Sequence, residues 1–411
     1  MKKLLQINPV VRENTSTGKI MRALGELAMD AGWASYIAYS RARDGVPAHS
    51  SQLVPVGDKL DLGIHWLATR LLDAHGLASR RATRQLIRRI REIDPDIVHI
   101  HNVHGYFLNY PLLCRFLAQR GKPVLWTTHD CWLFTGHCYH YSAAGCDRWQ
   151  TGCHDCPQKG AFPKSWLRDR SRRNWADKRA AFAGIPTLRL VAVSQWMKGE
   201  LAQSFLRDVP CQVISNGIDL QTFRPRPEEA DPIRKRHGIT APHFYLAVAS
   251  LWLPEKGLSD LSGLAGRLAE DEQLVLVGRM REEQRASLPR GVITIARTED
   301  AGALAALYTA ADALVNPTWQ DNYPTVNLEA VACGTPVVTY RTGGSVESVT
   351  PDTGIVVEQG DIAGLTDALH RIRGKGKAAF ARPCREYALA HFSKEDRFKD
   401  YISLYENLTA R

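Results

Sequence analysis

The sequence predicts an α/β protein with two doubly wound, Rossmann-like parallel sheets. Its 411 residues are too many for one ordinary core and suit two domains of about 200 residues. Short apolar runs alternate with helical patterns in the first half of the chain, and the alternation restarts in the second half. Such alternation gives parallel strands joined by right-handed crossovers.

In the first half, six apolar segments are expected to be strands: LLQINPV, WASYIAYS, DIVHIHNVH, PVLWTTHD, LRLVAVS and CQVISNGID. Helical patterns run over 19–31 and 111–120, and Gly32 and Gly121 end them, as glycine commonly does. A further helix is expected from Gln195. These elements predict a first domain over 1–215.

In the second half, the expected strands are HFYLAVASL, QLVLVG, GVITIA, ALVNP, PVVTY and GIVVE. The preceding segment NGIDLQTFRPRPEEADP is polar and proline-rich, which favours a hinge. The last segment, FSKEDRFKDYISLYENL, has apolar residues at helical spacing. The pattern predicts a second domain over 216–390 and a terminal helix within 391–411.

Composition is typical of a globular protein, with 44% hydrophobic residues and no apolar run near the ~18 residues of a spanning helix. The start MKKLLQINPVV is interrupted by polar residues and is interpreted as a first buried strand rather than a signal peptide. Nine cysteines, an odd number, favour a reducing compartment. We therefore expect a cytoplasmic protein.

The net charge of +10 is concentrated in part on RRATRQLIRRIR, a basic amphipathic helix with six arginines. A solvated helix face is one interpretation. The other is attraction to the anionic inner leaflet of a membrane, worth about 1 kcal/mol per basic residue near the surface. No recognition helix or aromatic-studded sheet motif is present, so nucleic acid is not an expected partner.

The segment ALVNPTWQDNYPTVNLEAVACGTPVVTY, residues 313–340, predicts a strand, a loop, a short helix and a second strand. Pro324 suits the first helical position, and Gly334 and Pro336 end the helix. The amides of Thr325 and Val326 would then point at an anionic group in the crevice at the strand ends.

Two acids flank this helix start: Asp321 and Glu329 are eight residues apart. A carboxylate there can accept two hydrogen bonds from neighbouring hydroxyls, such as those of a ribose. Together with the helix amides, this pattern predicts a nucleotide-sugar site.

The segment resembles the donor-site signature of family 4 retaining glycosyltransferases, two-domain enzymes of the GT-B architecture whose sheets face each other across a cleft. These enzymes usually carry Glu at the first acid, where this chain has Asp321 followed by Asn322. With the Cys-rich insert described below, the chain is most similar to colanic-acid-type fucosyltransferases and related exopolysaccharide enzymes. The resemblance covers nearly the whole chain. It implies a nucleotide-sugar donor, a saccharide acceptor that is often lipid-linked, and no catalytic metal.

The resemblance also implies roles in the second domain. Lys256, in ASLWLPEKGL, matches the lysine that holds the donor diphosphate, and Glu329 would bind the ribose. Asp321 would lie close to the donor sugar, with Asn322 beside it in the donor site. The family usually has an Arg just upstream of the lysine, where this chain reads Ser-Leu-Trp at 250–252.

In the first domain, His129 and Asp130 end the strand PVLWTTHD at the carboxyl edge of the sheet. By resemblance, His129 contacts the donor sugar near its reacting carbon and Asp130 orients the imidazole or binds a hydroxyl. The segment VHIHNVHG resembles an acceptor-side stretch of the same subfamily, with the crevice-lining residues His101, Asn102 and His104.

The first strand–helix turn, RENTSTGKI, stands where relatives often have a pair of glycines. Here Thr17 and Gly18, after Ser16, would have to take the place of those two glycines. A glycine at a helix start lets backbone amides approach a phosphate or an acceptor closely.

An insert over 131–165 contains Cys138, Cys146, Cys153 and Cys156, spaced C-x7-C-x6-C-x2-C. The closing Cys-x-x-Cys is a common half-site for tetrahedral zinc, and four thiolates leave no open position, so the expected ion is structural. His137, His140 and His154 are substitute ligands. Disulfides and unligated thiols remain alternatives, although a cytoplasmic compartment disfavours disulfides.

Two other functions are compatible with parts of the pattern. A sugar-nucleotide epimerase can share the architecture, but the lysine and acid pair argue against it. A zinc-stabilised scaffold or nucleic-acid-binding protein would use the cysteines and the basic helix. Thermal stabilisation by one class of nucleotide sugar would exclude the scaffold, because ligand at 100 times its Kd adds about 2.7 kcal/mol of stability.

Overall fold

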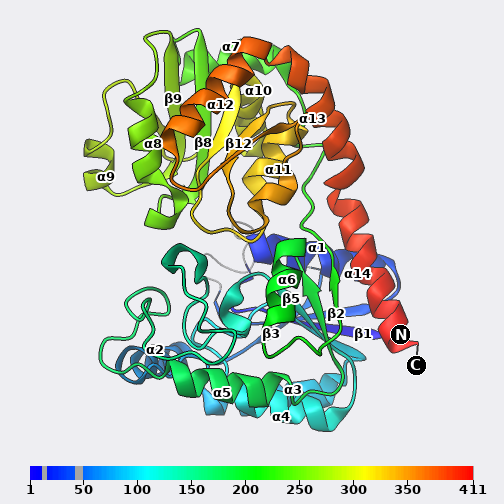
Figure 1. The fold of residues 1–411 in the computed structure, drawn as a ribbon. Coiled ribbons are helices and arrows are strands. Elements are labelled where there is room, and N and C mark those ends of the chain that lie inside the picture. Colours follow the sequence, from blue (N-terminus) through cyan, green and yellow to red (C-terminus); the bar gives the residue numbers. More distant parts are fainter. Residues whose placement is uncertain (12–15, 42–49, 411) are drawn as a thin grey trace. The chain divides into compact units, whose positions relative to one another are not determined.

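The computed structural model describes residues 1–11, 16–41 and 50–410. The chain forms two compact units (Figure 1). The first contains Met1–Ile214 together with Phe398–Arg411, and the second contains Ser215–Arg397. The first four residues of the segment RENTSTGKI, 12–15, lie outside the described residues.

The first unit contains, in its described part, a seven-stranded parallel sheet in the order β3-β2-β1-β4-β5-β6-β7. Its strands are β1 (Lys3–Ile7), β2 (Ala34–Tyr39), β3 (Gln52–Pro55), β4 (Ile97–Ile100), β5 (Val124–Thr128), β6 (Leu188–Ala192) and β7 (Cys211–Val213). Ile7 pairs in register with Ile100, which pairs in turn with Trp126. The carboxyl ends of β1, β4 and β5 therefore lie side by side.

Helices cover both faces of this sheet: α1 (Ser16–Asp30), α2 (Lys59–Leu72), α3 (Arg80–Ile93), α4 (Tyr110–Arg120), α5 (Ser171–Phe182), α6 (Gln195–Gln203) and α14 (Lys394–Thr409). One core joins alternate strand residues to buried side chains of α3, α4, α5 and α6. The other joins α1 to the last helix through Phe398, Tyr401 and Tyr405. A sheet apolar on both faces needs helices on both, as the doubly wound fold provides.

The basic segment predicted to be helical is α3. Leu86, Ile87 and Ile90 are buried in the core, whereas its six arginines are all exposed. This separation is the amphipathic pattern expected for a helix covering a sheet.

The second unit contains, among the described residues, a six-stranded parallel sheet in the order β10-β9-β8-β11-β12-β13. The strands are β8 (His243–Leu251), β9 (Glu272–Arg279), β10 (Ile293–Ile295), β11 (Ala313–Asn316), β12 (Val337–Tyr340) and β13 (Gly354–Val357). The helices are α7 (Pro227–Arg236), α8 (Leu258–Ala265), α9 (Glu282–Ala286), α10 (Ala301–Ala310), α11 (Thr325–Ala332), α12 (Ile362–Lys375) and α13 (Ala378–His391). Together the two sheets confirm the predicted fold class.

Two segments differ from the sequence-based expectation, and one of them is β3, which was not among the six strands expected in the first half. The polar, proline-rich stretch interpreted as a hinge contains α7, which begins at Pro227. A proline in the first turn costs no hydrogen bond, and acids at the start with bases at the end favour the helix dipole. Glu228 and Glu229 lie in the first turn, and Arg234, Lys235 and Arg236 in the last. A hinge elsewhere in the segment stays a prediction.

Candidate active site

In the second unit, Lys256 and Asp321 lie together at the carboxyl edge of the sheet. The ammonium of Lys256 is 2.8 Å from a carboxylate oxygen of Asp321, across 65 residues of sequence. The loop after β11 holds this arrangement, because the amide of Trp319 donates to the carbonyl of Glu255, 2.8 Å away. Gly257, with φ +73°, packs so closely that a Cβ there would lie 2.1 Å from the Pro317 carbonyl oxygen.

The Asp321 carboxylate keeps Lys256 charged. Burial by itself lowers the pKa of Lys256, but the charge and hydrogen bond of Asp321 outweigh burial and raise the pKa above its ordinary value. The side chain remains one-third exposed. A permanent positive charge with solvent access suits binding of a diphosphate.

Helix α11 starts where an anion would be expected. Its first two amides belong to Thr325 and Val326. Pro324 is the N-cap and not the first helical residue, so the helix begins one residue later than predicted. Within the described ranges, neither amide has a protein acceptor beyond the helix. Asn327 anchors the helix by accepting from Asn316 and donating to Ser345 and Ser348. The helix start therefore presents unused donors from a fixed position.

Glu329 lies on α11 and is half-buried. Its carboxylate accepts a hydrogen bond from the buried hydroxyl of Tyr308 at 3.0 Å. Burial and the Glu329 charge raise the pKa of Tyr308 well above its ordinary value, so the hydroxyl stays a donor. Tyr308 thereby fixes the rotamer of a carboxylate that retains acceptor capacity.

Three further residues at this edge were not predicted from the sequence. The Gln320 side-chain oxygen and the Thr342 hydroxyl are buried and have no hydrogen-bond partner among the described residues. The loop containing Thr342 contacts the loop that carries Asp321, because the Gly344 amide donates to the Asp321 carbonyl at 3.3 Å. β9 ends at Arg279, an exposed cation paired in register with Leu251, where the sequence lacks the expected upstream Arg. The glycine pair after β12 was the available signal for Thr342.

In the first unit, His101 and His129 come together from the ends of β4 and β5. The His101 Nδ1 atom is 3.2 Å from His129 Nε2, and His101 Nε2 is 3.0 Å from the Gln6 side-chain oxygen. The Gln6 amide nitrogen donates to the Met21 carbonyl, so its oxygen must accept from His101. This assignment makes His101 Nδ1 the acceptor and His129 Nε2 the donor.

Both imidazoles are neutral at pH 7. Burial lowers the pKa of His129 to about 4, although Asp130 opposes the shift. Burial lowers the pKa of His101 well below its ordinary value. The pair can therefore orient a hydroxyl or a sugar by hydrogen bonding, but it does not supply a fixed positive charge.

His104 and Asp130 form a second contact at this edge. His104 Nε2 lies 2.7 Å from one Asp130 oxygen, and the Trp132 amide donates to the other oxygen at 2.9 Å. Burial alone would raise the pKa of Asp130, but the charge and hydrogen bond of His104 and the Trp132 amide lower it. Asp130 is thus an oriented, ionised carboxylate.

The remaining predicted residues lie along the same strand ends. The Asn102 amide donates to the Ile7 carbonyl at 3.4 Å, joining the loop after β4 to the end of β1. Thr17, in the first turn of α1, accepts from the Asn8 side chain at 3.5 Å, and Gly18 follows it, buried. The topology therefore brings each predicted first-unit residue to one edge of one sheet.

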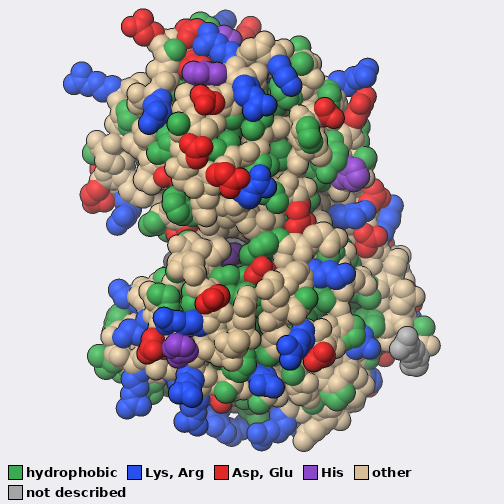
Figure 2. Space-filling view, viewed as in Figure 1, with side chains coloured by type: hydrophobic (Ala, Val, Ile, Leu, Met, Phe, Trp, Pro, Cys, Tyr) green, Lys and Arg blue, Asp and Glu red, His purple; other side chains and the backbone are tan. Residues whose placement is uncertain are grey.

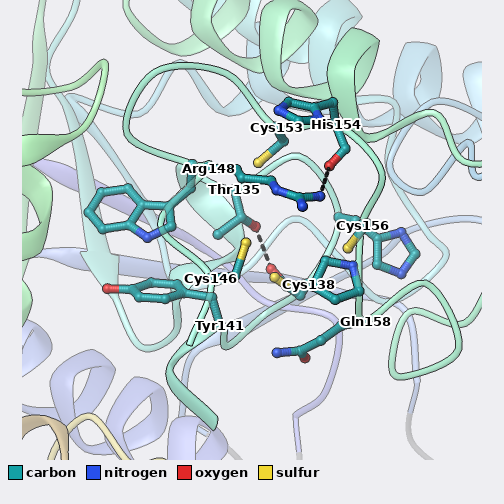
Figure 3. Close-up of a pocket in the computed structure, with 12 residues that line it drawn as sticks. Thr135, Cys138, Tyr141, Cys146, Arg148, Cys153, His154, Cys156 and Gln158 are labelled. Atoms are coloured by element: carbon teal, nitrogen blue, oxygen red, sulfur yellow. Dashed lines mark hydrogen bonds between the residues drawn. The ribbon is translucent and has the colours of Figure 1, made fainter. Parts of the chain in front are cut away.

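The cysteine insert packs beside this edge. All nine cysteines lie in the described part of the chain and are free thiols. Cys138, Cys146, Cys153 and Cys156 line one small cavity (Figure 3). The Cys138 thiol hydrogen-bonds to Cys156, which lowers the pKa of Cys156 to about 7 and raises that of Cys138 well above its ordinary value. As arranged, no three His, Cys, Asp or Glu side chains in the described residues form a ready metal site.

Two family models match the chain: "Glycosyltransferase Family 4" over residues 21–222 and "Glycosyl transferases group 1" over residues 242–374. The first match lies mostly in the first unit and extends past its boundary at Ile214 to residue 222, and the second match lies within the second unit. The chain is a glycosyltransferase with a family 4 domain followed by a group 1 domain.

Among curated proteins, the chain is 26% identical to a protein of Escherichia coli K12 named as the colanic acid biosynthesis glycosyl transferase WcaC. That match covers 98% of this chain and 100% of WcaC. A GDP-mannose-dependent phosphatidylinositol monomannoside mannosyltransferase of Corynebacterium glutamicum is 30% identical, over 44% of this chain and 51% of that protein. The chain thus spans the whole of WcaC and about half of the mannosyltransferase.

Solved structures show the same fold. Sucrose-phosphate synthase of Thermosynechococcus elongatus superposes with a TM-score of 0.72 at 19% identity, covering 100% of both chains. HepE of Anabaena in complex with UDP gives 0.71 at 16% identity, covering 99% of this chain and 100% of HepE. WaaG, a glycosyltransferase of lipopolysaccharide biosynthesis, gives 0.68 at 16% identity, with 99% and 100% covered. The fold is GT-B, as the sequence predicted.

Proposed function

We propose that this enzyme transfers a hexosyl or deoxyhexosyl group from a nucleotide sugar to a saccharide acceptor, with retention of anomeric configuration, in surface or exopolysaccharide biosynthesis. The observation that carries the proposal is the donor cluster of the second unit. It joins the charged Lys256, the unused amides of Thr325 and Val326, and the oriented carboxylate of Glu329. These are the groups that a diphosphate and a ribose require.

Glycosyl transfer breaks the bond between the anomeric carbon and the diphosphate oxygen and forms a bond from that carbon to an acceptor hydroxyl oxygen, whose proton leaves with the diphosphate. In the proposal, Lys256 and the α11 amides stabilise the negative charge that develops on the leaving diphosphate. Glu329 accepts hydrogen bonds from the ribose hydroxyls, and Asp321, with Asn322 next to it, lies near the donor sugar. These protein charges and dipoles take the part that a catalytic metal would otherwise play, so none is needed.

The first unit supplies the acceptor side in this proposal. His129 contacts the donor sugar as a neutral hydrogen-bonding group, and Asp130 orients hydroxyls as an ionised acceptor. His101, Asn102 and His104 line the acceptor path, and the Thr17–Gly18 turn lies at the same sheet edge. HepE has been solved with UDP and with UDP-glucose, and WcaC is named for colanic acid synthesis, which supports this class of donor and product.

We further propose that the first unit binds the anionic inner face of a membrane, where a lipid-linked acceptor would be. Among the described residues, none of the helices combines the length and the apolar character needed to cross a bilayer. The first unit instead carries the exposed arginines of α3, and Figure 2 shows Lys and Arg side chains gathered along the edge where Figure 1 places α3 and α5.

An exposed apolar stripe adds to these charges. Leu60, Ile64 and Leu67 recur at helical spacing on α2 and are 67%, 55% and 47% exposed. Beside them, Trp66 and Trp166 form an edge-to-face pair, with the Arg70 guanidinium within 6 Å of both rings (5.4 and 5.9 Å). Tryptophan, leucine and arginine are the residues that place a helix in the headgroup region of a bilayer.

Vesicle binding tests the membrane proposal. Sedimentation with anionic liposomes should fall as salt is added, because exposed charges are screened within about 8 Å at physiological ionic strength. The variant Ile64→Glu/Leu67→Glu should bind less at every salt concentration, since it removes the apolar contribution but none of the arginines. Equal binding to neutral and anionic vesicles would contradict the proposal.

A donor panel tests the transferase proposal. Thermal shifts with GDP-, UDP- and dTDP-sugars should show stabilisation by one nucleotide class, which at 100 times Kd corresponds to about 2.7 kcal/mol. The stabilising donor is then assayed with saccharide and lipid-linked saccharide acceptors, and the product's anomeric configuration is read by NMR. Interconversion of sugar nucleotides without an acceptor would identify an epimerase instead, and an inverted product would exclude retention.

A further inference from the structure

The cysteine insert contains a cavity with unusual lining. Besides Cys138, Cys146, Cys153 and Cys156, His137 contributes to its wall. Its volume is about 10 Å³, close to that of one water-sized sphere. Figure 3 shows the four sulfur atoms directed toward the same space. The cavity can thus hold one atom or ion, and its cysteine thiols are soft metal ligands.

Backbone donors already orient one of the sulfurs. The Gly136 amide donates to the Cys153 sulfur at 3.1 Å. This approach requires glycine, because a Cβ at position 136 would lie 2.2 Å from the Ser171 carbonyl oxygen and 2.7 Å from the Cys153 Cβ. Amide hydrogen bonds to sulfur stabilise a thiolate and orient it, as the outer groups of metal sites commonly do.

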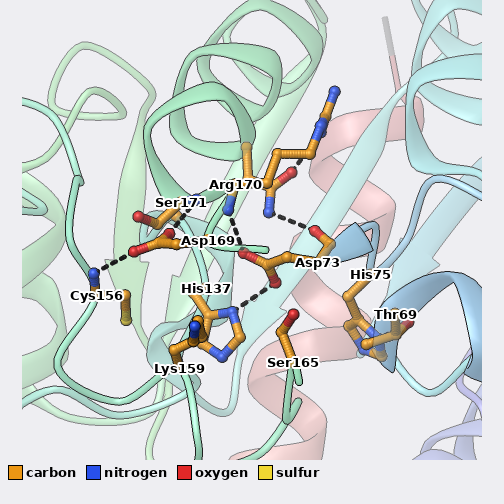
Figure 4. A network of polar contacts seen from close by, with 12 residues as sticks. Thr69, Asp73, His75, His137, Cys156, Lys159, Ser165, Asp169, Arg170 and Ser171 are labelled. Atoms are coloured by element: carbon orange, nitrogen blue, oxygen red, sulfur yellow. Dashed lines mark hydrogen bonds and ion pairs between the residues drawn. The ribbon is translucent and has the colours of Figure 1, made fainter. Parts of the chain in front are cut away.

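His137 adds a second observation that points to a ligand. Its Nδ1 donates to the Asp73 carboxylate at 2.6 Å, and both side chains are buried (Figure 4). Asp73 is fixed in turn by the Arg170 amide at 2.9 Å. The other ring nitrogen, Nε2, is buried and has no hydrogen-bond partner anywhere in the described ranges. A buried polar atom without a protein partner is costly, so His137 Nε2 calls for a ligand on this side of the cavity.

Lys178 supplies a third observation, this time of charge. Its ammonium is buried, donates to the carbonyls of Trp132 at 2.5 Å and Thr135 at 2.9 Å, and lies 3.3 Å from the centre of the Trp132 ring. No carboxylate forms an ion pair with it in the part of the chain that the structure describes. Burial lowers the pKa of Lys178, and Asp130 and Asp73 oppose this shift only from beyond ion-pair distance, so further negative charge nearby would stabilise the buried ammonium.

We propose that Cys138, Cys146, Cys153 and Cys156 bind one structural Zn²⁺, with Lys178 compensating the charge of the complex. Four thiols lose four protons to solvent, and the four thiolates with Zn²⁺ leave a net charge of 2−. The sulfurs close around the ion to the tetrahedral distance of about 2.3 Å. His137 borders the ion as the substitute ligand, and Asp73 holds its imidazole in place. This site is independent of the proposed sugar transfer.

The ion would connect three parts of the first unit. His137 and Asp73 join the insert to the end of α2, and Lys178 joins it to α5. The insert begins directly after Asp130, at η1 (Cys131–Leu133), where the Asp130 side chain caps the first turn. Zinc would therefore stiffen the loop that carries the His104–Asp130 contact.

Metal content provides the test. Untagged protein from zinc-supplemented cells should contain about one zinc per chain by elemental analysis. Cobalt exchanged into the protein should give the intense absorption of tetrahedral thiolate coordination. Cys146→Ser, Cys153→Ser and Cys156→Ser should each lose stoichiometric zinc, whereas the control Cys211→Ser, which alters a cysteine of β7, should retain it.

Two measurements on the unaltered chain keep the proposal falsifiable even when a variant fails to fold. Denatured, metal-free protein should titrate as nine free thiols. A count of seven or fewer would show that a disulfide forms, and that the metal site proposed here does not. Reduced protein that takes up neither zinc nor cobalt would overturn the site. If Cys146→Ser retained zinc, the four-thiolate set would be wrong and His137 would be the fourth ligand.

Discussion

The Lys256 ammonium lies 2.8 Å from the Asp321 carboxylate, so the cation proposed to hold the donor diphosphate is already paired in the absence of donor. The pairing fixes the lysine rotamer before donor binds, which reduces the entropic cost of ordering it. It also means that a diphosphate competes with Asp321 for the same charge.

Replacing Lys256 or Glu329 by Ala should lower kcat/KM at least tenfold in each variant, about 1.4 kcal/mol of transition-state stabilisation. The lysine variant loses charge next to the leaving diphosphate, and the glutamate variant loses the ribose acceptor. Lys235→Ala, on the exposed side of α7, is the control for loss of a cation in the same unit. Normal turnover in both folded variants would refute the donor assignment.

Asp321→Asn should separate binding from turnover. Removing the carboxylate frees Lys256 and removes a negative charge that repels the diphosphate, so the Kd for the nucleoside diphosphate should fall severalfold. Because Asp321 is proposed to lie next to the donor sugar, kcat should fall in the same variant. Calorimetry with the nucleoside diphosphate gives the Kd, and initial rates with the full donor give kcat. Weaker nucleotide binding would contradict this account of the pair.

Gly257→Ala should disrupt the donor site through the backbone. The residue has φ +73°, and its Cβ would lie 2.1 Å from the Pro317 carbonyl oxygen, so the two loops carrying Lys256 and Asp321 must separate. Gly238→Ala is the matched control, with φ +67° but open space around the new Cβ. We expect loss of donor-induced thermal stabilisation in the first variant only. Equal effects of the two would show that the backbone angle, and not the contact, matters.

The first unit should lose stability as pH falls below about 6.5. Burial lowers the pKa of His129 to about 4 and of His65 to about 3, from an ordinary 6.5. Between those values the unfolded chain binds protons that the folded chain does not, so stability present above pH 6.5 is lost on acidification. Each such histidine contributes up to about 1.4 kcal/mol per pH unit in this window.

Urea midpoints between pH 7.5 and 5 measure this dependence. His65→Gln should reduce the slope of midpoint against pH, even if the variant is less stable overall, because one depressed group is removed. A flat profile in the unaltered protein would contradict the neutral histidines.

Local patterns predicted α3, the donor helix and all the parallel strands except β3, because each depends on neighbours in sequence. The start of α11 was misplaced by a single residue, at Pro324. Contacts that depend on distant residues could not be predicted. The sequence shows neither that the Trp319 amide bonds to Glu255 nor that Asp73 reaches His137 across 64 residues. α7 was missed because proline was weighed as a breaker, although it suits a first helical turn.

The last helix contributes Phe398, Tyr401 and Tyr405 to a core of the first unit, and the Tyr405 hydroxyl lies 2.6 Å from buried His99. That core therefore lacks three aromatic side chains until residues 398–405 have been synthesised. Domains generally fold in order during translation, but here the first unit stays incomplete until the whole second unit, Ser215–Arg397, has emerged. A ribosome-bound chain ending at residue 397 would expose apolar sheet surface, so the first unit begins before the second and is completed after it.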